Sequence, residues 1–360
     1  MPPTAGPLLG RRSFLRWSGM AAGALGGGAL LAACGGGSDS GAAPAAPGSN
    51  QYGRVALQLS WIKNTEFNGE YMADSKGYYR EAGFEGVDLL AGGSASTGVE
   101  TNLVSGKCWA GLSAPVITAP AILQGAPLKI VGATYQKNPF CIVSAATKPI
   151  ATPQDMVGKK IGVQDSNDQV WNGLLKANSI DPASINRVPV QFDPSVLTTG
   201  EVDGYLGYIT NEPNTLKVKG FATQSFLFAD HGLPLVAETV TVLQETIDNE
   251  REKLKAFLRA EIRGWKDAVA DPGAATRLAV GNYGKDQNLD YAEQLLEATD
   301  QNGLVVSDET RTNGLFTISD RPVEENLQAL RLAGSAVSKE QLFDLSLISE
   351  VYAADPSLKS

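Results

Sequence analysis

The sequence predicts an α/β protein with two lobes and a ligand cleft between them. From about residue 52, segments with the two-residue period of strands alternate with segments that have the period of helices. Two alternating runs of similar size follow each other, which indicates a first lobe made of 52–138 and 234–360 and a second lobe made of 139–233. Strands that alternate with helices favour parallel sheets with helices on both faces.

Each element of the first run has its own pattern. The segment VALQLS, at 55–60, places Val55, Leu57 and Leu59 on one face of a strand. The helical pattern that follows ends near Gly83, and glycine is typical of helix ends. Strands are predicted at 55–60, 86–93, 108–114 and 128–135, and helices at 68–84, 97–107 and 116–126.

The second run repeats this alternation after residue 152. Helices are predicted at 168–180 and 214–221, and strands at 187–192 and 223–230. The segments 153–164 and 194–209 each combine a helix with the strand that follows it.

A strand at 238–244 and then strongly helical sequence complete the chain. In 249–272 the apolar residues recur at steps of three and four, so this helix presents one buried stripe that includes Trp265. Further helical segments within 291–306, 324–334 and 340–352 are expected to complete the first lobe.

The first 33 residues have the pattern of an export signal. Arg11 and Arg12 before Ser13 match the twin-arginine pattern, and the apolar run that follows is too short and glycine-rich to span a membrane comfortably. Leu-Ala-Ala-Cys, ending at Cys34, matches the cleavage box of bacterial lipoproteins. We therefore expect lipidation at Cys34, a flexible tether at 34–51, and a domain held at the outer face of the cytoplasmic membrane.

The composition argues against several classes of function. The formal net charge of −9 argues against binding nucleic acid or anionic lipid through bulk charge. The sequence has no Cys-x-x-Cys pair and one histidine, His231, so we predict no metal site. Cys108 and Cys141 can pair in an oxidising compartment, but their apolar, strand-like segments favour free thiols. No motif ties a nucleophile to Asp230 and His231, so we predict neither catalytic residues nor a cofactor.

The candidate binding segments follow from where parallel sheets bind ligands. Ligands lie beyond the carboxyl ends of strands, where loops lead into helices. With the two lobes face to face, these loops would line one cleft. The rule selects 60–64, 92–96 and Ser113 in the first lobe, and 164–167, Asp193 and 208–212 in the second.

Five stretches of the chain resemble solute-binding proteins of ABC importers, in the branch that binds pyrimidine precursors of thiamine. They are LQLSWIKNTEFNGEYMADSKGYYREAGF, GAPLKIVGATYQKNPFCIVS, DMVGKKIGVQ, VPVQFDPSVLTTGEVDGYLGYITNEPNTLKVKGF and KLKAFLRAEIRGWKDAVADP. Relatives of this branch bind riboflavin, nitrate, sulfonates or taurine. The resemblance, over about 54–275, implies a two-lobed type II periplasmic-binding-protein fold that closes on a small ligand and docks on a membrane permease.

The resemblance also suggests which residues bind the ligand. The pyrimidine-precursor binders supply a tryptophan and an asparagine from the first loop, and a tyrosine and a glutamate from a Tyr-x-x-Asn-Glu-Pro segment. Here the matching residues are Trp61, Asn64, Tyr208 and Glu212, with Asn211 in the same segment. A flat ring can stack between Trp61 and Tyr208, and Glu212 can accept a hydrogen bond from an exocyclic amine. Asn211 and Glu212 can instead cap a turn at the hinge.

Phe140, which follows Pro139 at the crossover between lobes, is a candidate third aromatic wall or a hinge-packing residue. We therefore expect a monomeric solute-binding protein that passes a flat heterocycle to an ABC permease. The expected ligand is a hydroxymethyl- or formylaminomethyl-pyrimidine precursor of thiamine. Riboflavin, a small oxyanion such as nitrate, a sulfonate or taurine, and a sensor role without transport are the alternatives.

A thiamine pyrimidine synthase-like enzyme is the distant alternative. Fungal enzymes that resemble this fold make the pyrimidine from pyridoxal phosphate and their own histidine. Those enzymes carry that histidine where Phe67 stands here, and a cysteine-rich cluster where this chain has LPLVAETVTVLQ. Both features are missing, so we predict that the chain is not an enzyme.

Overall fold

Two five-stranded sheets organise residues 50–93 and 96–359, the part of the chain that this computed structural model describes. The predicted export signal, Cys34 and the tether up to residue 49 lie outside the described residues.

The first sheet has the strand order β2-β1-β3-β10-β4. Strand β1 pairs in parallel with β2 and β3, and β10 runs antiparallel to β3 and β4. Val55, Leu57 and Leu59 are buried, as the alternation of apolar residues predicts. The bounds are β1 Arg54–Gln58, β2 Gly86–Leu90, β3 Ala110–Ser113, β4 Leu128–Tyr135 and β10 Ala237–Leu243.

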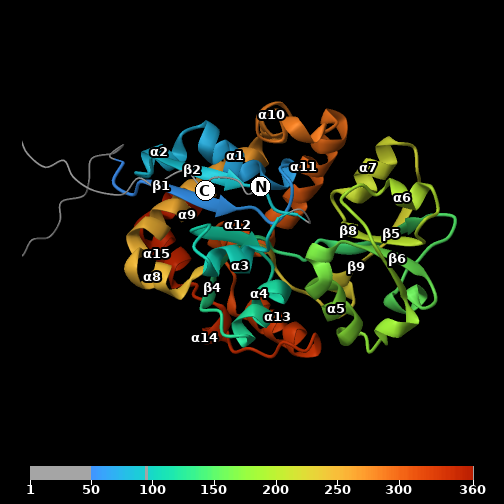
Figure 1. Cartoon of the computed structure of the whole chain (residues 1–360). Coiled ribbons are helices and arrows are strands. Elements are labelled where there is room, and N and C mark those ends of the chain that lie inside the picture. The colour runs from blue at the N-terminus through green and yellow to red at the C-terminus, as the bar shows by residue number, and fades with distance from the viewer. Residues whose placement is uncertain (1–49, 94–95, 360) are drawn as a thin grey trace, which may run out of the picture. The chain divides into compact units, whose positions relative to one another are not determined.

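The second sheet has the order β7-β6-β8-β5-β9. Strand β6 pairs in parallel with β7 and β8, whereas β5 runs antiparallel to β8 and β9. The bounds are β5 Phe140–Ala145, β6 Lys160–Val163, β7 Asn186–Pro189, β8 Gly204–Tyr208 and β9 Thr223–Leu227. Figure 1 shows the two sheets side by side, the second within the green and yellow part of the chain.

The prediction of parallel sheets is wrong for one strand of each sheet. Strands β5 and β10 are the first strands after the chain crosses from one sheet to the other. Each therefore enters its sheet from the side of the crossover and runs against its neighbours. The remaining strands are joined by helical connections and are parallel, as the alternating pattern predicts.

The helices mostly follow the predicted pattern. The helical segment predicted at 68–84 is two helices, because Gly77 adopts a left-handed conformation with φ of 79° between them. The helices from the first α/β units are α1 Asn68–Ser75, α2 Tyr78–Glu81, α3 Val99–Val104, α4 Pro115–Leu123, α5 Asp168–Ala177, α6 Ser195–Thr198 and α7 Glu212–Val218. The later helices are α8 Gln244–Asn249, α9 Arg251–Ala270, α10 Pro272–Leu278, α11 Tyr291–Val305, α12 Asp308–Asn313, α13 Asp320–Leu332, α14 Lys339–Leu342 and α15 Ser346–Ala354.

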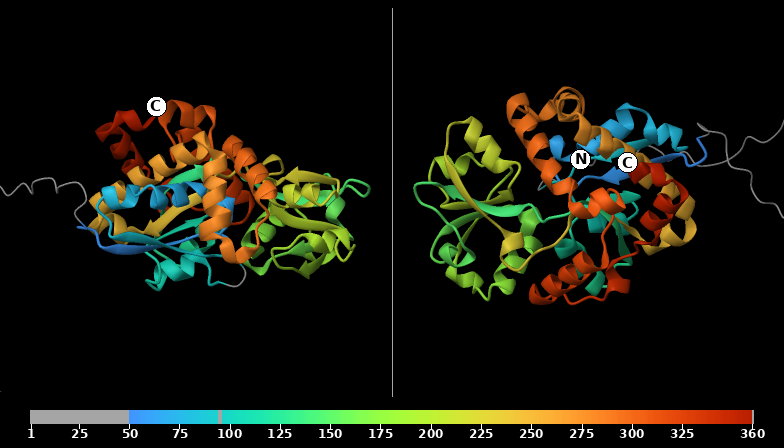
Figure 2. Two further views of the ribbon diagram at one scale, coloured as in Figure 1. Left: turned by 90° about the horizontal axis from the view of Figure 1, so that it is seen from above. Right: turned by 180° about the vertical axis from the view of Figure 1, so that it is seen from behind.

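Two of the C-terminal helices contact elements of both sheets. Helix α11 packs on α7 and on the single turn Thr65–Phe67 that follows β1, and both views in Figure 2 place it between the sheets. Helix α13 packs on α4 and also on α5, which connects β6 to β7. The C-terminal segment, which the sequence analysis assigns to the first lobe, therefore contacts elements associated with both sheets.

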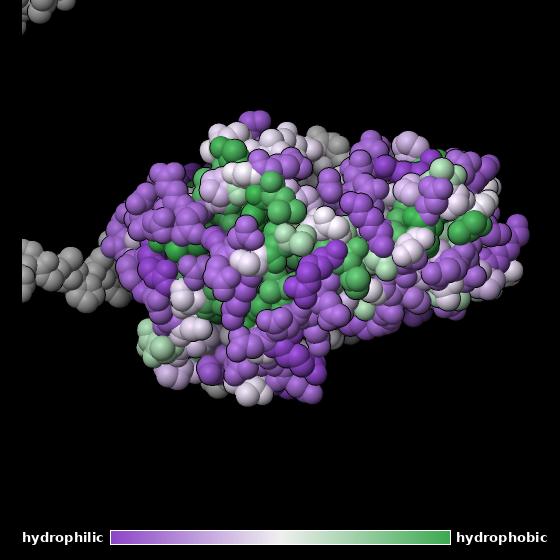
Figure 3. Space-filling view, turned by 90° about the horizontal axis from the view of Figure 1, so that it is seen from below, coloured by the Kyte–Doolittle hydropathy of each residue, from purple (hydrophilic) through white to green (hydrophobic). Residues whose placement is uncertain are grey.

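The apolar residues are gathered in buried cores. Trp265 on α9 is only 1% exposed, which confirms its prediction as a core residue. Cys108 and Cys141 are both buried and unpaired. The face shown in Figure 3 is mainly polar, with scattered apolar patches. None of the described helices combines the length and the apolar character that a membrane span requires.

Candidate functional site

A cavity of about 490 Å³ lies at the strand ends of the two sheets. Its wall includes the loops after β1 and β3 from the first sheet, and the loops after β6 and β8 from the second. This is the place that the strand-end rule predicts, and the volume lies in the range of pockets for small organic ligands.

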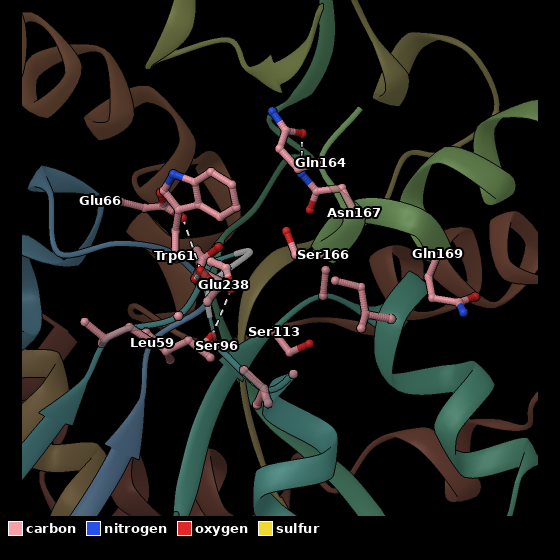
Figure 4. A pocket seen from close by; sticks show the side chains of 18 of the residues that line it. Leu59, Trp61, Glu66, Ser96, Ser113, Gln164, Ser166, Asn167, Gln169 and Glu238 are labelled. Carbon is pink, nitrogen blue, oxygen red and sulfur yellow. Dashed lines mark hydrogen bonds between the residues drawn. The ribbon is translucent and has the colours of Figure 1, made fainter. Parts of the chain in front are cut away.

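Three aromatic residues from the two sheets line the cavity: Trp61, Phe140 and Tyr208. Phe140 begins β5 and pairs with Tyr208 at the end of β8. Their rings meet edge to face, with centroids 4.6 Å apart at 85°. Trp61 is half-buried in the loop after β1, and Figure 4 shows its indole beside Glu66.

Glu212 begins α7 and turns its carboxyl group back toward β8. Its Oε2 accepts a hydrogen bond of 2.7 Å from the backbone N–H of Tyr208. A Cβ atom on Gly207 would lie 2.3 Å from that oxygen, so glycine is required for this close approach. Burial raises the pKa of Glu212 to about 7, because a charged carboxylate is disfavoured away from water.

Asn64 and Asn211 share a hydrogen-bond acceptor, Glu297, that the sequence analysis did not identify. The side-chain amide of each donates to Oε1 of Glu297 on α11, at 3.2 Å in both cases. Asn64 also accepts from the backbone N–H of Glu66 and so caps the turn after β1. Asn211 lines the cavity, whereas Asn64 lines a neighbouring groove of about 300 Å³ that shares Trp61 and Asn211 with it.

Two buried carboxyl groups, Glu66 and Glu238, form the part of the cavity wall beside Trp61 (Figure 4). Ser60 Oγ lies 2.8 Å from Oε2 of Glu238 and 3.3 Å from Oε1 of Glu66. The hydroxyl of Tyr208 donates to Oε1 of Glu238 at 2.9 Å. Burial, followed by the charge of Glu238, raises the pKa of Glu66 well above its usual range. Sequence reasoning placed Glu238 in a strand and did not mark either residue as functional.

Another part of the cavity wall is polar, and its side chains are held by hydrogen bonds. Gln164 donates to the backbone carbonyl of Leu206 at 2.9 Å and accepts from Asn167 at 3.0 Å. Glu100 accepts hydrogen bonds from Ser113 at 2.5 Å and from Thr118 at 2.8 Å. Figure 4 shows Gln164 and Asn167 across the cavity from Trp61 and Glu238.

The cavity wall is acidic. Among the described residues that line it there is no lysine, arginine or histidine, but there are six carboxylic acids. Arg187 neutralises two of them, Asp165 and Asp168, through ion pairs. The other four form no ion pair with any described lysine or arginine: Glu66, Glu100, Glu212 and Glu238. In the described ranges, no group of histidine, cysteine and acidic residues is arranged to hold a metal ion.

Comparison with known proteins gives this cavity a context. Residues 64–275 match the family described as NMT1/THI5 like. Riboflavin-binding protein RibY of Chloroflexus aurantiacus is 29% identical over 318 residues, which cover 84% of this chain and 88% of RibY. 4-Amino-5-hydroxymethyl-2-methylpyrimidine phosphate synthase of Legionella pneumophila is 25% identical over 232 residues, 62% of this chain and 72% of that protein.

The fold is also found among solved structures. The periplasmic aliphatic sulphonate binding protein SsuA of Escherichia coli superposes with a TM-score of 0.58 at 14% identity, over 77% of this chain and 86% of SsuA. At this identity the likeness concerns the fold, which is the two-lobed periplasmic-binding-protein fold expected from the sequence. The family match spans more than half of the chain, and the chain therefore belongs to the NMT1/THI5 like family.

Proposed function

We propose that this protein is the solute-binding component of an ABC importer, held at the outer face of the membrane by a lipid on Cys34. Its cavity takes a flat nitrogen heterocycle that is uncharged or positively charged. The observation that carries the proposal is the wall itself, which combines three aromatic rings with four carboxyl groups that form no ion pair with a described basic residue. Stacking on Trp61 and Tyr208 would contribute about 1–3 kcal/mol per ring face.

A ligand with fused rings, of the riboflavin class, agrees best with these features. The likeness to RibY extends over most of both chains, and a cavity of about 490 Å³ has room for more than a single ring. An aminopyrimidine precursor of thiamine is the second candidate. It is favoured by the position of Glu212, whose buried carboxyl group can accept a hydrogen bond from an exocyclic amine.

An oxyanion is a poor match for the cavity. Sites for sulfonate or nitrate offer positive side chains or free backbone donors, because a buried anion needs compensation. The wall supplies carboxyl groups instead, and the N–H of Gly92 already donates to the carbonyl of Trp61 at 2.8 Å. The structural likeness to SsuA is therefore not extended to its ligand.

Binding without catalysis is the proposed role. Phe67 stands where the fungal enzymes that resemble this fold carry the histidine used in synthesis. Here the phenylalanine is completely buried in the core. The described cavity lining has no histidine, lysine or cysteine that could act as a nucleophile or form a Schiff base. The remaining side chains can orient and enclose a ligand.

Isothermal titration of the purified domain, from residue 50 onward, tests the proposal. Riboflavin, 4-amino-5-hydroxymethyl-2-methylpyrimidine, thiamine, nitrate and an alkylsulfonate serve as probes. We expect binding of riboflavin or the aminopyrimidine and at least a tenfold loss in Trp61→Ala. Trp109→Ala is the matched control, because Trp109 packs on Phe84 and Phe257 away from the cavity. Binding of the sulfonate alone would overturn the proposed ligand class.

A further inference from the structure

Glu238 has an unusual backbone conformation at the edge of the cavity. It lies within β10 yet has a φ of 45°, a left-handed value that is rare for a residue other than glycine. The residues on either side of it are paired with β4, Ala237 with Tyr135 and Thr239 with Ala133, and the register shifts between Val240 and Thr241. Such a conformation is unfavourable for a residue with a side chain and persists where the surrounding structure imposes it. The residue at this kink is thus one whose carboxyl group lines the cavity.

The carboxyl group of Glu238 has most of its acceptor positions occupied. The Tyr208 hydroxyl donates to Oε1 at 2.9 Å, and the Ser60 hydroxyl donates to Oε2 at 2.8 Å. A third hydrogen bond joins it to the carboxyl group of Glu66. A carboxylate has about four acceptor positions. One position is therefore left on a carboxyl group that lines the cavity.

The protons of this pair can be assigned from its surroundings. Burial, followed by the charge of Glu238, raises the pKa of Glu66 well above its usual range, so Glu66 is the member of the pair that holds a proton more firmly and donates it to Glu238. Burial raises the pKa of Glu238 as well, but the hydrogen bonds from Glu66, Ser60 and Tyr208 oppose this rise because they favour the carboxylate, so Glu238 is the member of the pair that loses its proton more readily.

Among the described residues that line the cavity, no lysine, arginine or histidine compensates this carboxylate. Besides Glu66 and Tyr208, the titratable groups that influence or are influenced by Glu238 are Glu70 on α1 and Tyr135 on β4. All of them are acids. A buried carboxylate of this kind favours a partner that brings a hydrogen-bond donor or a positive charge.

We propose that Glu238, oriented by Ser60, Glu66 and Tyr208, is the residue that selects the ligand, by accepting a hydrogen bond from a ring N–H or an amino group. The inference rests on the proposed function and makes it specific. The cavity discriminates against heterocycles whose corresponding edge carries only acceptors, because an acceptor facing Glu238 would leave the carboxylate unpaired.

Matched ligand pairs test the inference directly. One pair is riboflavin and its N3-methyl derivative; the other is 4-amino-5-hydroxymethyl-2-methylpyrimidine and its N,N-dimethylamino analogue. In each pair methylation removes a donor and keeps the ring. With the pair whose parent compound binds, the unaltered domain should prefer the parent by about 10–100-fold, the range for a hydrogen bond to a charged group.

Three variants separate the role of Glu238 from general damage. Glu238→Gln should bring the preference within the pair to about threefold or less, because the amide presents a donor where the carboxylate offered an acceptor. Tyr208→Phe and Glu66→Gln leave the Glu238 carboxylate in place and should keep a preference of at least tenfold. Melting temperatures recorded without ligand identify any variant that has not folded.

Each outcome has a distinct meaning. Equal affinity of the unaltered domain for both members of a pair would overturn the inference, even if Glu238→Gln does not fold. A preference that persists in folded Glu238→Gln would also overturn it, while the proposed function stands. Failure of every heterocycle to bind the unaltered domain would instead overturn the proposed function, and this inference with it.

Discussion

The hydroxyl of Tyr208 donates a hydrogen bond of 2.9 Å to Oε1 of Glu238, joining the end of β8 in the second sheet to β10 in the first. The same tyrosine packs its ring on Phe140 and gives its backbone N–H to Glu212. Tyr208 thus contacts the aromatic wall through Phe140, bonds to the carboxyl groups of Glu212 and Glu238, and links the two sheets. Movement of the sheets relative to each other would have to break this bond.

Tyr208→Phe should lower the free energy of unfolding by about 1.5–3 kcal/mol, because it leaves a buried charged acceptor without one of its donors. Urea unfolding measures this value. Tyr205→Phe is the matched control: it lies in the same strand and loses a bond to the carbonyl of Gln191, outside the cavity lining. Tyr205→Phe should lose stability as well but keep the ligand affinity, whereas Tyr208→Phe should lose both. An equal loss of affinity in the two variants would contradict a specific role for Tyr208.

Glu297→Ala should weaken the connection between α11, α7 and the loop after β1. The substitution leaves the amides of Asn64 and Asn211 without their shared acceptor, at about 1–3 kcal/mol for each buried donor. We expect a lower melting temperature and a larger radius of gyration by small-angle X-ray scattering in the absence of ligand, which saturating ligand should reverse.

Thr299→Ala is the control for this experiment, because Thr299 lies on the same helix but is exposed and bonds only to the carbonyl of Leu295. If Glu297→Ala matched this control in radius of gyration, the two asparagine contacts would not hold the sheets together. A loss of stability alone would then describe Glu297 as a local packing residue.

The pKa values of two buried glutamates predict how stability depends on pH. Burial raises the pKa of Glu70 and of Glu212 from 4.5 to about 7 in the folded protein. The folded state therefore holds their protons more strongly than the unfolded chain does. Their stabilising contribution is full below pH 4.5 and is lost as the pH rises to about 7, by about 3 kcal/mol per group at about 1.4 kcal/mol per pKa unit.

The unfolding free energy should accordingly fall between pH 4.5 and 7, and Glu212→Gln should reduce this slope because its side chain does not titrate. Glu350→Gln provides the comparison. Arg251 and Lys255 lower the pKa of Glu350 to about 2, so its titration in the folded state lies below this window. A slope that is the same in Glu212→Gln and the unaltered protein would show that Glu212 does not titrate as its burial indicates.

Part of the site was accessible from the sequence because it follows from strand ends. Trp61 comes directly after a predicted strand, Tyr208 lies at the end of another and Glu212 follows it closely, and parallel strands bring such positions to one edge. The same rule could not separate Asn64 from Trp61, although they are three residues apart. The turn after β1 directs Asn64 toward Glu297 on α11, a helix more than 200 residues later, and no local pattern contains that contact.

The rest depended on backbone detail that residue patterns do not carry. Glu238 precedes a run of β-branched residues, so its segment is typical of an ordinary strand, and only the positive φ reveals the kink. The directions of β5 and β10 follow from the crossovers between the sheets. The alternation of apolar residues within a strand does not indicate this direction. Burial of Glu66 likewise arises from packing of segments distant in the sequence.

Gly207→Ala tests whether the position of the Glu212 carboxyl group matters for binding. The added Cβ would lie 2.3 Å from Oε2 and 2.6 Å from Cδ of Glu212, so the side chain must move and give up its bond to the N–H of Tyr208. We expect at least a tenfold weaker affinity for the heterocycle by isothermal titration. The strand itself should persist, because alanine is compatible with a strand.

Gly303→Ala is the matched substitution, since a Cβ there meets nothing within 4 Å and the residue lies within α11. It should raise stability by about 0.5–1 kcal/mol without changing affinity, as expected for alanine in a helix. An unchanged affinity in folded Gly207→Ala would mean that Glu212 does not contact the ligand. The donor groups of the heterocycle would then be bound by Glu238 alone, and the preference within the matched ligand pairs should remain as large in Gly207→Ala as in the unaltered domain.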